Sequence, residues 1–125
     1  MKLFILVIAF AGLVHGRQYI QCAAYDSWDR AVINLDGKNS TLFLTNGVHR
    51  PDEVRVLKNL FHIETNDSRA LFETRGSKVV DMVRIPLEFL DVRASNFEVV
   101  IGHRNMRSGY ESERTLSCFS AIYEK

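Results

Sequence analysis

The 125-residue chain has two cysteines, Cys22 and Cys118, which stand 96 positions apart and close to the two ends of the expected mature protein. An even pair of cysteines in an exported chain predicts a disulfide. The alternatives are two free thiols or half of a metal site, but a structural zinc ion needs four closely spaced nitrogen or sulfur ligands. A Cys22–Cys118 bond requires a fold in which the first and last parts of the domain touch.

The N-terminal segment has the pattern of a cleavable signal peptide. A lysine follows the first methionine, residues 3–14 form an almost unbroken apolar run, and Val14 and Gly16 are small enough for a cleavage site. The run is too short to span a bilayer. We therefore expect a signal peptide over residues 1–16 and one secreted domain over residues 17–125, without a membrane anchor. A buried N-terminal helix is the alternative.

Charge and motifs narrow the function classes. The 16 Lys and Arg residues nearly balance the 15 Asp and Glu residues, whereas a protein that binds nucleic acid mainly through phosphates usually has a basic excess. The chain has no G-x-S-x-G, no H-E-x-x-H and no phosphate-binding glycine loop. We expect neither a metal nor another cofactor. Two sequons place candidate glycans on surface loops, at Asn39 and Asn66.

The clearest secondary-structure signal predicts a helix over about residues 27–36, ended by Gly37 in a left-handed cap. Its apolar positions share one helical face: Trp28, Ala31, Val32 and Leu35. A helical turn is expected near residues 52–58. Short β-prone runs predict strands over about 19–24, 41–44, 60–65, 70–74, 79–85, 97–101 and 116–123. This order predicts an α+β fold in which one α-helix packs on an antiparallel β-sheet and the disulfide fastens the first strand to the last.

Two stretches of polar and aromatic residues are the candidate binding surfaces. The first is the segment from His49 to Glu53. The second is a predicted loop that carries four candidate contact residues, His103, Arg104, Arg107 and Tyr110. Basic and aromatic side chains on a loop suit contacts with a protein or with RNA bases.

The layout also resembles a known family. Tyr19 and Cys22 after the signal peptide, a predicted helix next, and Cys118 near the end resemble the RNase-like effectors of powdery mildew fungi, which are delivered into plant cells. The family's Tyr-x-Cys motif has one additional residue here, between the tyrosine and the cysteine. The stretches 84–87 and 97–101 extend the resemblance, and the layout is similar to the fungal guanyl-specific ribonucleases, which share the distant cysteine pair.

The resemblance implies that the catalytic residues have been replaced. The enzymes' Glu-x-Pro motif reads Arg84-Ile85-Pro86 here, and their Asp-Arg-Val-Val motif reads Phe97-Glu98-Val99-Val100. Arg84 therefore takes the position of the catalytic base, and Glu98 takes the position of the catalytic arginine. No histidine lies within residues 107–117. A permanently charged arginine cannot accept the 2′-hydroxyl proton, and a carboxylate repels the negative transition state.

The resemblance therefore implies a secreted, monomeric, non-catalytic effector. It would act inside a plant cell, away from membranes, by binding a host protein, an immune receptor or RNA. One alternative is an active secreted ribonuclease that uses His62, Glu64 and His103. Another is an extracellular binding or inhibitory domain of a different lineage.

Overall fold

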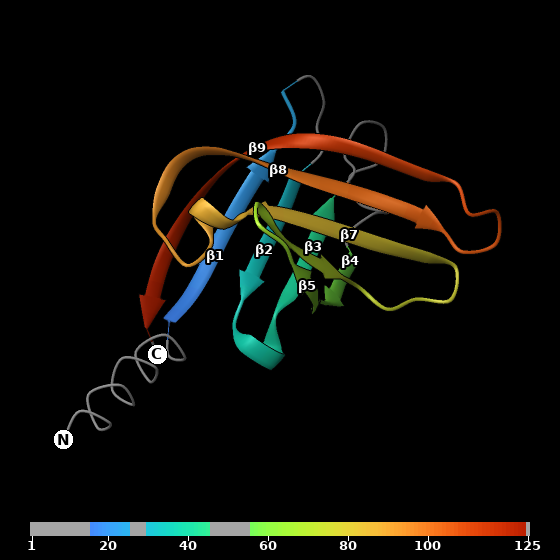
Figure 1. Ribbon diagram of the computed structural model, residues 1–125, viewed down its shortest axis with the longest axis horizontal. Helices are drawn as coiled ribbons and strands as arrows, with labels where there is room; N and C mark the ends of the chain where they lie inside the picture. The colour runs from blue at the N-terminus through green and yellow to red at the C-terminus, as the bar shows by residue number, and fades with distance from the viewer. Residues whose placement is uncertain (1–15, 26–29, 46–55, 125) are drawn as a thin grey trace.

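The computed structural model describes residues 16–25, 30–45 and 56–124, which form a nine-stranded antiparallel sheet with two short 3-10 helices (Figure 1). The strands are β1 (Gly16–Ala23), β2 (Arg30–Leu35), β3 (Thr41–Thr45), β4 (Val56–Asn59), β5 (Phe61–Thr65), β6 (Arg69–Glu73), β7 (Val79–Pro86), β8 (Ala94–Asn105) and β9 (Glu111–Glu124). The 3-10 helices are η1 (Gly37–Asn39) and η3 (Leu87–Phe89). Within these ranges, no helix has the length and apolar character needed to cross a membrane. Apart from Gly16, the predicted signal peptide lies outside the described residues.

Except for β4 and β5, strands that follow one another in the chain lie side by side, and the sheet nearly closes into a barrel. The order is β4-β3-β2-β1-β9-β8-β7-β6-β5, so the first strand pairs with the last. The two sheet edges, β4 and β5, are separated in sequence only by Leu60. The Leu60 N–H donates to the carbonyl oxygen of Ser40 at 2.9 Å, whereas Phe61 already pairs with Glu73 of β6. The chain thus crosses from one edge to the other at Leu60, and this crossing is the seam of the barrel.

Alternation of apolar residues explains why these segments become strands. On β2, Ala31, Ile33 and Leu35 are buried in the interior, while Val32 and Asn34 point outward and are half-buried. A period of two puts every second residue on the same face of a strand. The interior is built from such residues on all sides of the barrel, including Ile20, Leu42, Leu60, Phe72, Val83, Ile85, Phe97, Val99, Ile101 and Leu116.

The predicted helix over residues 27–36 is wrong, and with it the α+β fold. Residues 30–35 form β2, and no α-helix occurs in the described ranges. The positions 31, 32 and 35 fit a helical face, but 31, 33 and 35 fit a strand face equally well, and the β-branched Val32 and Ile33 favour the strand. Trp28 lies outside the described residues. The helix-on-sheet fold implied by the ribonuclease resemblance is therefore not the fold of this chain.

The predicted strands are confirmed as elements, although their bounds shift. The sequence predicts a helical turn near residues 52–58. This prediction is wrong for residues 56–58, which belong to β4, and residues 52–55 lie outside the described part of the chain. Gly37 has the expected positive φ of 56°, but it lies in the β2–β3 connection instead of at a helix end. Pro86 ends β7, as its missing N–H predicts.

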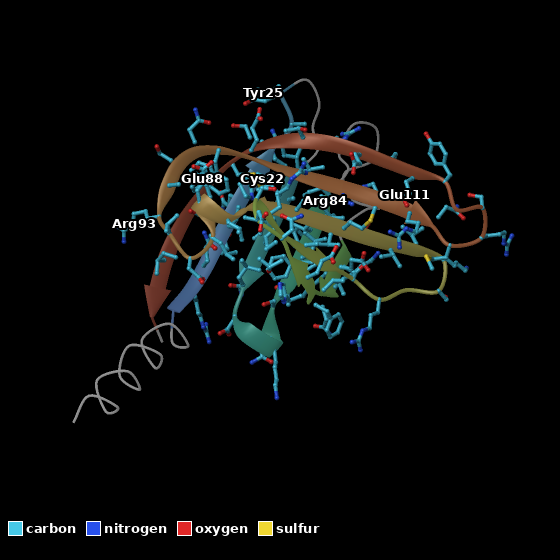
Figure 2. The ribbon with its side chains drawn as sticks, in the orientation of Figure 1. Cys22, Tyr25, Arg84, Glu88, Arg93 and Glu111 are labelled. Atoms are coloured by element: carbon cyan, nitrogen blue, oxygen red, sulfur yellow. A yellow bond between two sulfur atoms is a disulfide. The ribbon has the colours of Figure 1, made fainter. Side chains whose placement is uncertain are left out.

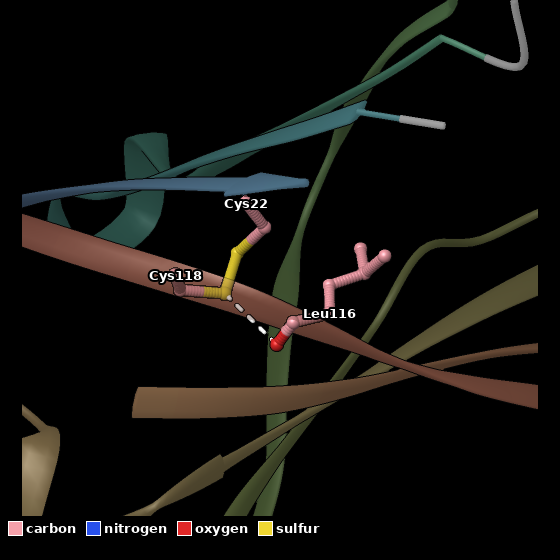
Figure 3. Close-up of a disulfide and its surroundings, with 3 residues drawn as sticks. All are labelled: Cys22, Leu116 and Cys118. Atoms are coloured by element: carbon pink, nitrogen blue, oxygen red, sulfur yellow. Dashed lines mark hydrogen bonds between the residues drawn. A yellow bond between two sulfur atoms is a disulfide. The ribbon is translucent and has the colours of Figure 1, made fainter. Parts of the chain in front are cut away.

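The predicted disulfide between Cys22 and Cys118 is confirmed. The two residues are direct partners in the β1–β9 pairing, their Cα atoms lie 4.1 Å apart, and both side chains are buried (Figure 3). The sulfur of Cys118 packs 3.6 Å from the carbonyl oxygen of Leu116. The bond fastens the first strand to the last, as predicted, and because β1 and β9 lie in the middle of the sheet order it reinforces the centre of the sheet.

We predict that the double variant Cys22→Ala/Cys118→Ala loses about 4–5 kcal/mol of unfolding free energy. The bond closes a loop that spans nearly the whole domain, and this closure lowers the conformational entropy of the unfolded chain. Urea denaturation of residues 17–125, oxidised wild type against the variant, measures the loss. A difference below about 1 kcal/mol would contradict the prediction, because the β1–β9 ladder alone would then hold the ends together.

Candidate functional site

Among the described residues, Asp81 is the charged residue whose side chain is buried, with 3% exposed. It points into the barrel from β7, directly opposite His103 of β8. One carboxylate oxygen, Oδ2, accepts a hydrogen bond from Lys58 Nζ at 2.7 Å, and the other, Oδ1, lies 2.5 Å from His103 Nδ1. Both oxygens of the buried carboxylate are therefore engaged, which is the condition for burying a charge at acceptable cost.

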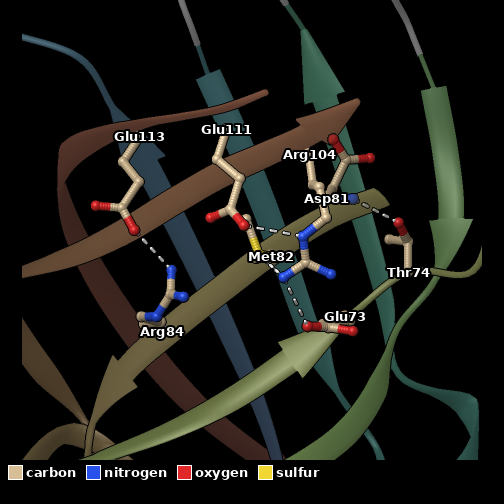
Figure 4. A network of polar contacts seen from close by, with 8 residues as sticks. All are labelled: Glu73, Thr74, Asp81, Met82, Arg84, Arg104, Glu111 and Glu113. Atoms are coloured by element: carbon tan, nitrogen blue, oxygen red, sulfur yellow. Dashed lines mark hydrogen bonds and ion pairs between the residues drawn. The ribbon is translucent and has the colours of Figure 1, made fainter. Parts of the chain in front are cut away.

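The backbone of Asp81 is fixed by Thr74 at the start of the β6–β7 turn. The N–H of Asp81 donates to Thr74 Oγ1 at 2.9 Å, and the N–H of Thr74 donates to the carbonyl oxygen of Asp81 at 3.0 Å (Figure 4). The turn also requires Gly76, because a Cβ there would lie only 2.4 Å from the carbonyl oxygen of Val79. The turn thus holds Asp81 in one position.

Electrostatics keep Asp81 ionised. Burial alone raises the pKa of its carboxyl, but hydrogen bonds from His103 and Lys58 and the positive charges of these groups outweigh burial, so the pKa lies below its ordinary value of 3.8. Lys58 belongs to the edge strand β4, and Asp81 belongs to β7, the third strand from the other edge. The ion pair therefore links the two halves of the sheet across the seam.

The cluster also orients His103. A carboxylate at Nδ1 fixes the imidazole ring and leaves Nε2 as its outer end, and 45% of the His103 side chain is exposed. Ser112 of β9 is the cross-strand partner of His103. Such an imidazole can exchange a proton or hydrogen-bond a ligand. The described residues contain no group of three or more His, Cys, Asp or Glu that could hold a metal ion.

Above this cluster, the β6–β7 turn (residues 74–78) and the β8–β9 turn (residues 106–110) lie together, and we call them, with Val79, the hairpin tip (Figure 1). The N–H of Met106 donates to the carbonyl oxygen of Lys78 at 2.8 Å and joins the turns. Large apolar side chains are exposed here, with exposed fractions of 37% for Val79, 46% for Met106 and 71% for Tyr110.

The β8–β9 turn is internally braced. The side-chain oxygen of Asn105 accepts hydrogen bonds from the N–H groups of Arg107 at 2.9 Å and Ser108 at 3.0 Å. Gly109 has a φ of 78°, a conformation that other residues rarely adopt. The exposed side chains of the hairpin tip therefore sit on an ordered backbone.

A second set of polar residues covers the outer face of β6 to β9 (Figure 4). Arg104 lies 3.1 Å from Glu111 and 4.0 Å from Glu73, and its guanidinium also contacts the sulfur of the fully buried Met82. Arg84 pairs with Glu113 at 2.9 Å across β8 (Figure 4). These pairs are partly exposed, so each contributes little to stability, but together they fix the arginine side chains against the sheet.

The structure divides the predicted contact loop between three places. His103 points into the barrel, Arg104 points outward into the ion pairs, and Arg107 and Tyr110 lie exposed in the hairpin tip. His49, with the other predicted surface, lies outside the described residues. Figure 2 labels two residues near the end of β1 that differ in exposure: Cys22 is buried and Tyr25 is exposed.

Arg84 and Glu98 occupy neighbouring strands, yet they are not partners. Arg84 lies opposite Val100 and is engaged by Glu113, whereas Glu98 is an exposed residue of β8. Their interpretation as replaced catalytic residues depends on the ribonuclease-like fold, which this chain lacks. Both glycan candidates are exposed: Asn39 in η1 and Asn66 in the β5–β6 turn.

The alternative acid–base set of His62, Glu64 and His103 is not assembled. A bulge between His62 and Glu64 places His62 opposite the inward-facing Phe72 and Glu64 opposite the outward-facing Leu71, so the two side chains lie on different faces. His62 contacts Phe72 at a ring separation of 5.3 Å and Thr65 Oγ1 at 2.7 Å. The assumed i, i+2 spacing does not hold across a bulge.

Sequence reasoning missed Lys58, Thr74 and Asp81. One signal was available: Asp81 interrupts the apolar run from Val79 to Val83, and a charge at an inward-facing strand position needs partners. Nothing local to Lys58 or Thr74 identifies them as those partners.

No family model, curated protein or solved structure matches this chain. The disulfide is consistent with an extracellular protein.

We predict that Asp81→Asn lowers the unfolding free energy at pH 7 by about 2–4 kcal/mol, because it leaves the partly buried ammonium group of Lys58 without its countercharge. Because the folded-state pKa of Asp81 is lowered, its charge stabilises the protein fully above the ordinary carboxyl range. This stabilisation is lost as the pH falls below 3.8 through the folded-state pKa.

Urea denaturation between pH 7 and pH 2.5 measures both effects. The variant should show a weaker loss of stability in acid than the wild type. Glu111→Gln, which removes a carboxylate from an exposed pair, is the matched control and should change stability by less than about 1 kcal/mol. Equal acid dependence in the wild type and Asp81→Asn would exclude the stabilising role of the Asp81 charge.

Proposed function

We propose that the protein is a secreted, non-catalytic binding protein that recognises a protein partner through its hairpin tip. The observation that carries this proposal is the exposure of Val79, Met106 and Tyr110 on two turns that are fixed to each other and to the barrel. Tyrosine, methionine and arginine are enriched in protein interfaces, and binding residues commonly lie on loops held by a rigid scaffold. An ordered tip also lowers the entropy cost of binding.

The charges of the tip favour one kind of partner. Lys78 and Arg107 are exposed beside the apolar residues, and the structure gives neither side chain an ion pair within the described ranges. A protein surface with carboxylates around an apolar depression would complement this arrangement. RNA is the less favoured partner, because the chain has no basic excess and the tip carries a single aromatic ring, that of Tyr110.

Secretion is supported by the signal-peptide pattern of residues 1–16 and by the disulfide. The proposal does not include delivery into a plant cell or detection by an immune receptor, because both came from a resemblance whose implied fold differs from this barrel. It corresponds to the extracellular binding domain of a different lineage. We expect the binding unit to be a monomer.

We predict that Met106→Ala/Tyr110→Ala weakens binding to the physiological partner by at least about tenfold, as expected for central apolar anchors of an interface. The measurement is capture by immobilised residues 17–125 from extracellular fluid and tissue extracts, followed by affinity titration of each captured protein. Ile63→Ala/Val92→Ala removes exposed apolar surface elsewhere, on β5 and in the β7–β8 connection, and should bind like the wild type.

Each capture is repeated after ribonuclease treatment. Capture that survives this treatment and depends on the tip supports the proposal. Capture that ribonuclease abolishes would show that the partner is RNA and not a protein. An equal loss of affinity in both double variants would show that the binding surface does not lie on the tip.

We also predict that residues 17–125 do not cleave RNA. The carboxylate of Asp81 is occupied by Lys58 and His103, and no second acid or base is positioned beside the imidazole in the described ranges. Incubation with total RNA should give the same cleavage for the wild type, His62→Ala, His103→Ala and buffer. Turnover that disappears in one of the two histidine variants would identify an active ribonuclease instead.

A further inference from the structure

We propose that Asn66 carries an N-linked glycan and that the first sugars of this glycan lie in a polar groove on the outer face of β5, β6 and β7. Two independent observations meet here: the geometry of the turn that contains the sequon, and a groove of which Asn66 forms one wall. The proposal does not depend on the proposed partner binding.

The β5–β6 turn presents the correct atom of Asn66. The side-chain oxygen of Asn66 accepts hydrogen bonds from the N–H of Ser68 at 2.8 Å, the N–H of Arg69 at 2.8 Å and the hydroxyl of Ser68 at 3.2 Å. Backbone N–H groups require an acceptor, so the oxygen must face them. The amide nitrogen Nδ2, which a sugar would join, is therefore directed away from the turn, and residues 66–68 are all exposed.

The groove that Asn66 lines suits a neutral polyol. It has a volume of about 340 Å³ and is lined by Asn66, Ser68, Glu64, Arg69, Arg84 and Glu113. The two carboxylates accept hydrogen bonds and the two guanidinium groups donate them, which matches sugar hydroxyls that do both. Their charges cancel, so the lining does not favour an anion or a cation. A volume of this size lies within the range of small-ligand sites, roughly 300–1,000 Å³.

One arginine–carboxylate pair of the groove is already positioned. Arg84 and Glu113 are paired at 2.9 Å, and Leu71, half-buried on β6, contributes an apolar patch for the carbon face of a sugar ring. Because Asn66 is itself part of the lining, a sugar attached to Nδ2 would enter the groove without the entropy cost of a separate binding event.

The other sequon provides an internal comparison. Asn39 is exposed in η1, but Ser40 is buried and none of the three sequon residues lines this groove. In the up-and-down order, the β2–β3 connection and the β5–β6 turn lie at the end of the barrel opposite the hairpin tip. A glycan on Asn66 would therefore leave the tip uncovered.

The attachment step is a glycosyl transfer in the secretory pathway from an oligosaccharide linked to a lipid diphosphate. The bond between sugar C1 and the diphosphate oxygen breaks, and the bond between C1 and Asn66 Nδ2 forms. The lipid diphosphate leaves with the electron pair, and Nδ2 loses one proton to the transferase.

The experiment is expression of the full chain in a eukaryotic secreting cell, followed by peptide mapping before and after peptide N-glycosidase treatment. We expect Asn66 to be occupied, and Asn66→Gln and Ser68→Ala each to remove one glycan mass. Asp67→Asn keeps the sequon and should keep the glycan. An unmodified Asn66 in the wild-type chain overturns the site, and this readout needs no variant to fold.

The groove is tested by the rate at which peptide N-glycosidase releases the Asn66 glycan. Release should be several-fold slower from the folded than from the denatured protein, and Arg69→Ala should raise the folded-state rate while leaving release from Asn39, where it is occupied, unchanged. Equal rates from folded and denatured protein, or no effect of Arg69→Ala, would place the sugars outside the groove.

Discussion

The pairing of β1 with β9 is the constraint on which the rest of the structure depends. It joins the first and last strands in a ladder that runs from Gly16 opposite Glu124 to Ala23 opposite Ser117, with the disulfide next to its end. β2, β3 and β4 continue the sheet from β1, and β8 to β5 continue it from β9. Without this ladder the meander would be two separate sheets, each with an unprotected apolar face. The covalent bond therefore acts where the two halves of the barrel meet.

The interior changes in character along its length, and this change connects the fold to its proposed function. Apolar side chains fill the middle, whereas Lys58, Thr74, Asp81 and His103 form a polar cluster toward the hairpin tip. The cluster ties β4, β7 and β8 together immediately below the tip, so the exposed residues above it rest on a fixed base. Rigid support of this kind is what allows a few exposed side chains to recognise a partner specifically.

Local patterns in the sequence identified the strand segments and the cysteine pair, because alternation and composition act within a few residues. They could not choose between helix and strand for 30–35, where apolar residues fit a helical face at 31, 32 and 35 and a strand face at 31, 33 and 35. They could not predict closure, since the pairing of Ala23 with Ser117 depends on contacts far apart in the chain. Arg107 and Tyr110 were recognised as surface residues, but the meeting of Lys58 with Asp81 requires the seam, which no local pattern contains.

The crossing at Leu60 limits how this barrel can vary in length. The register of β4 is set by β3, the register of β5 is set by β6, and the single residue between them is almost completely buried. Inserting or deleting one residue at this joint would exchange the inward-facing and outward-facing side chains of either β4 or β5 and would remove Leu60 from the interior. The surface connections can absorb such changes, so the joint is where we locate the least tolerance to insertions and deletions.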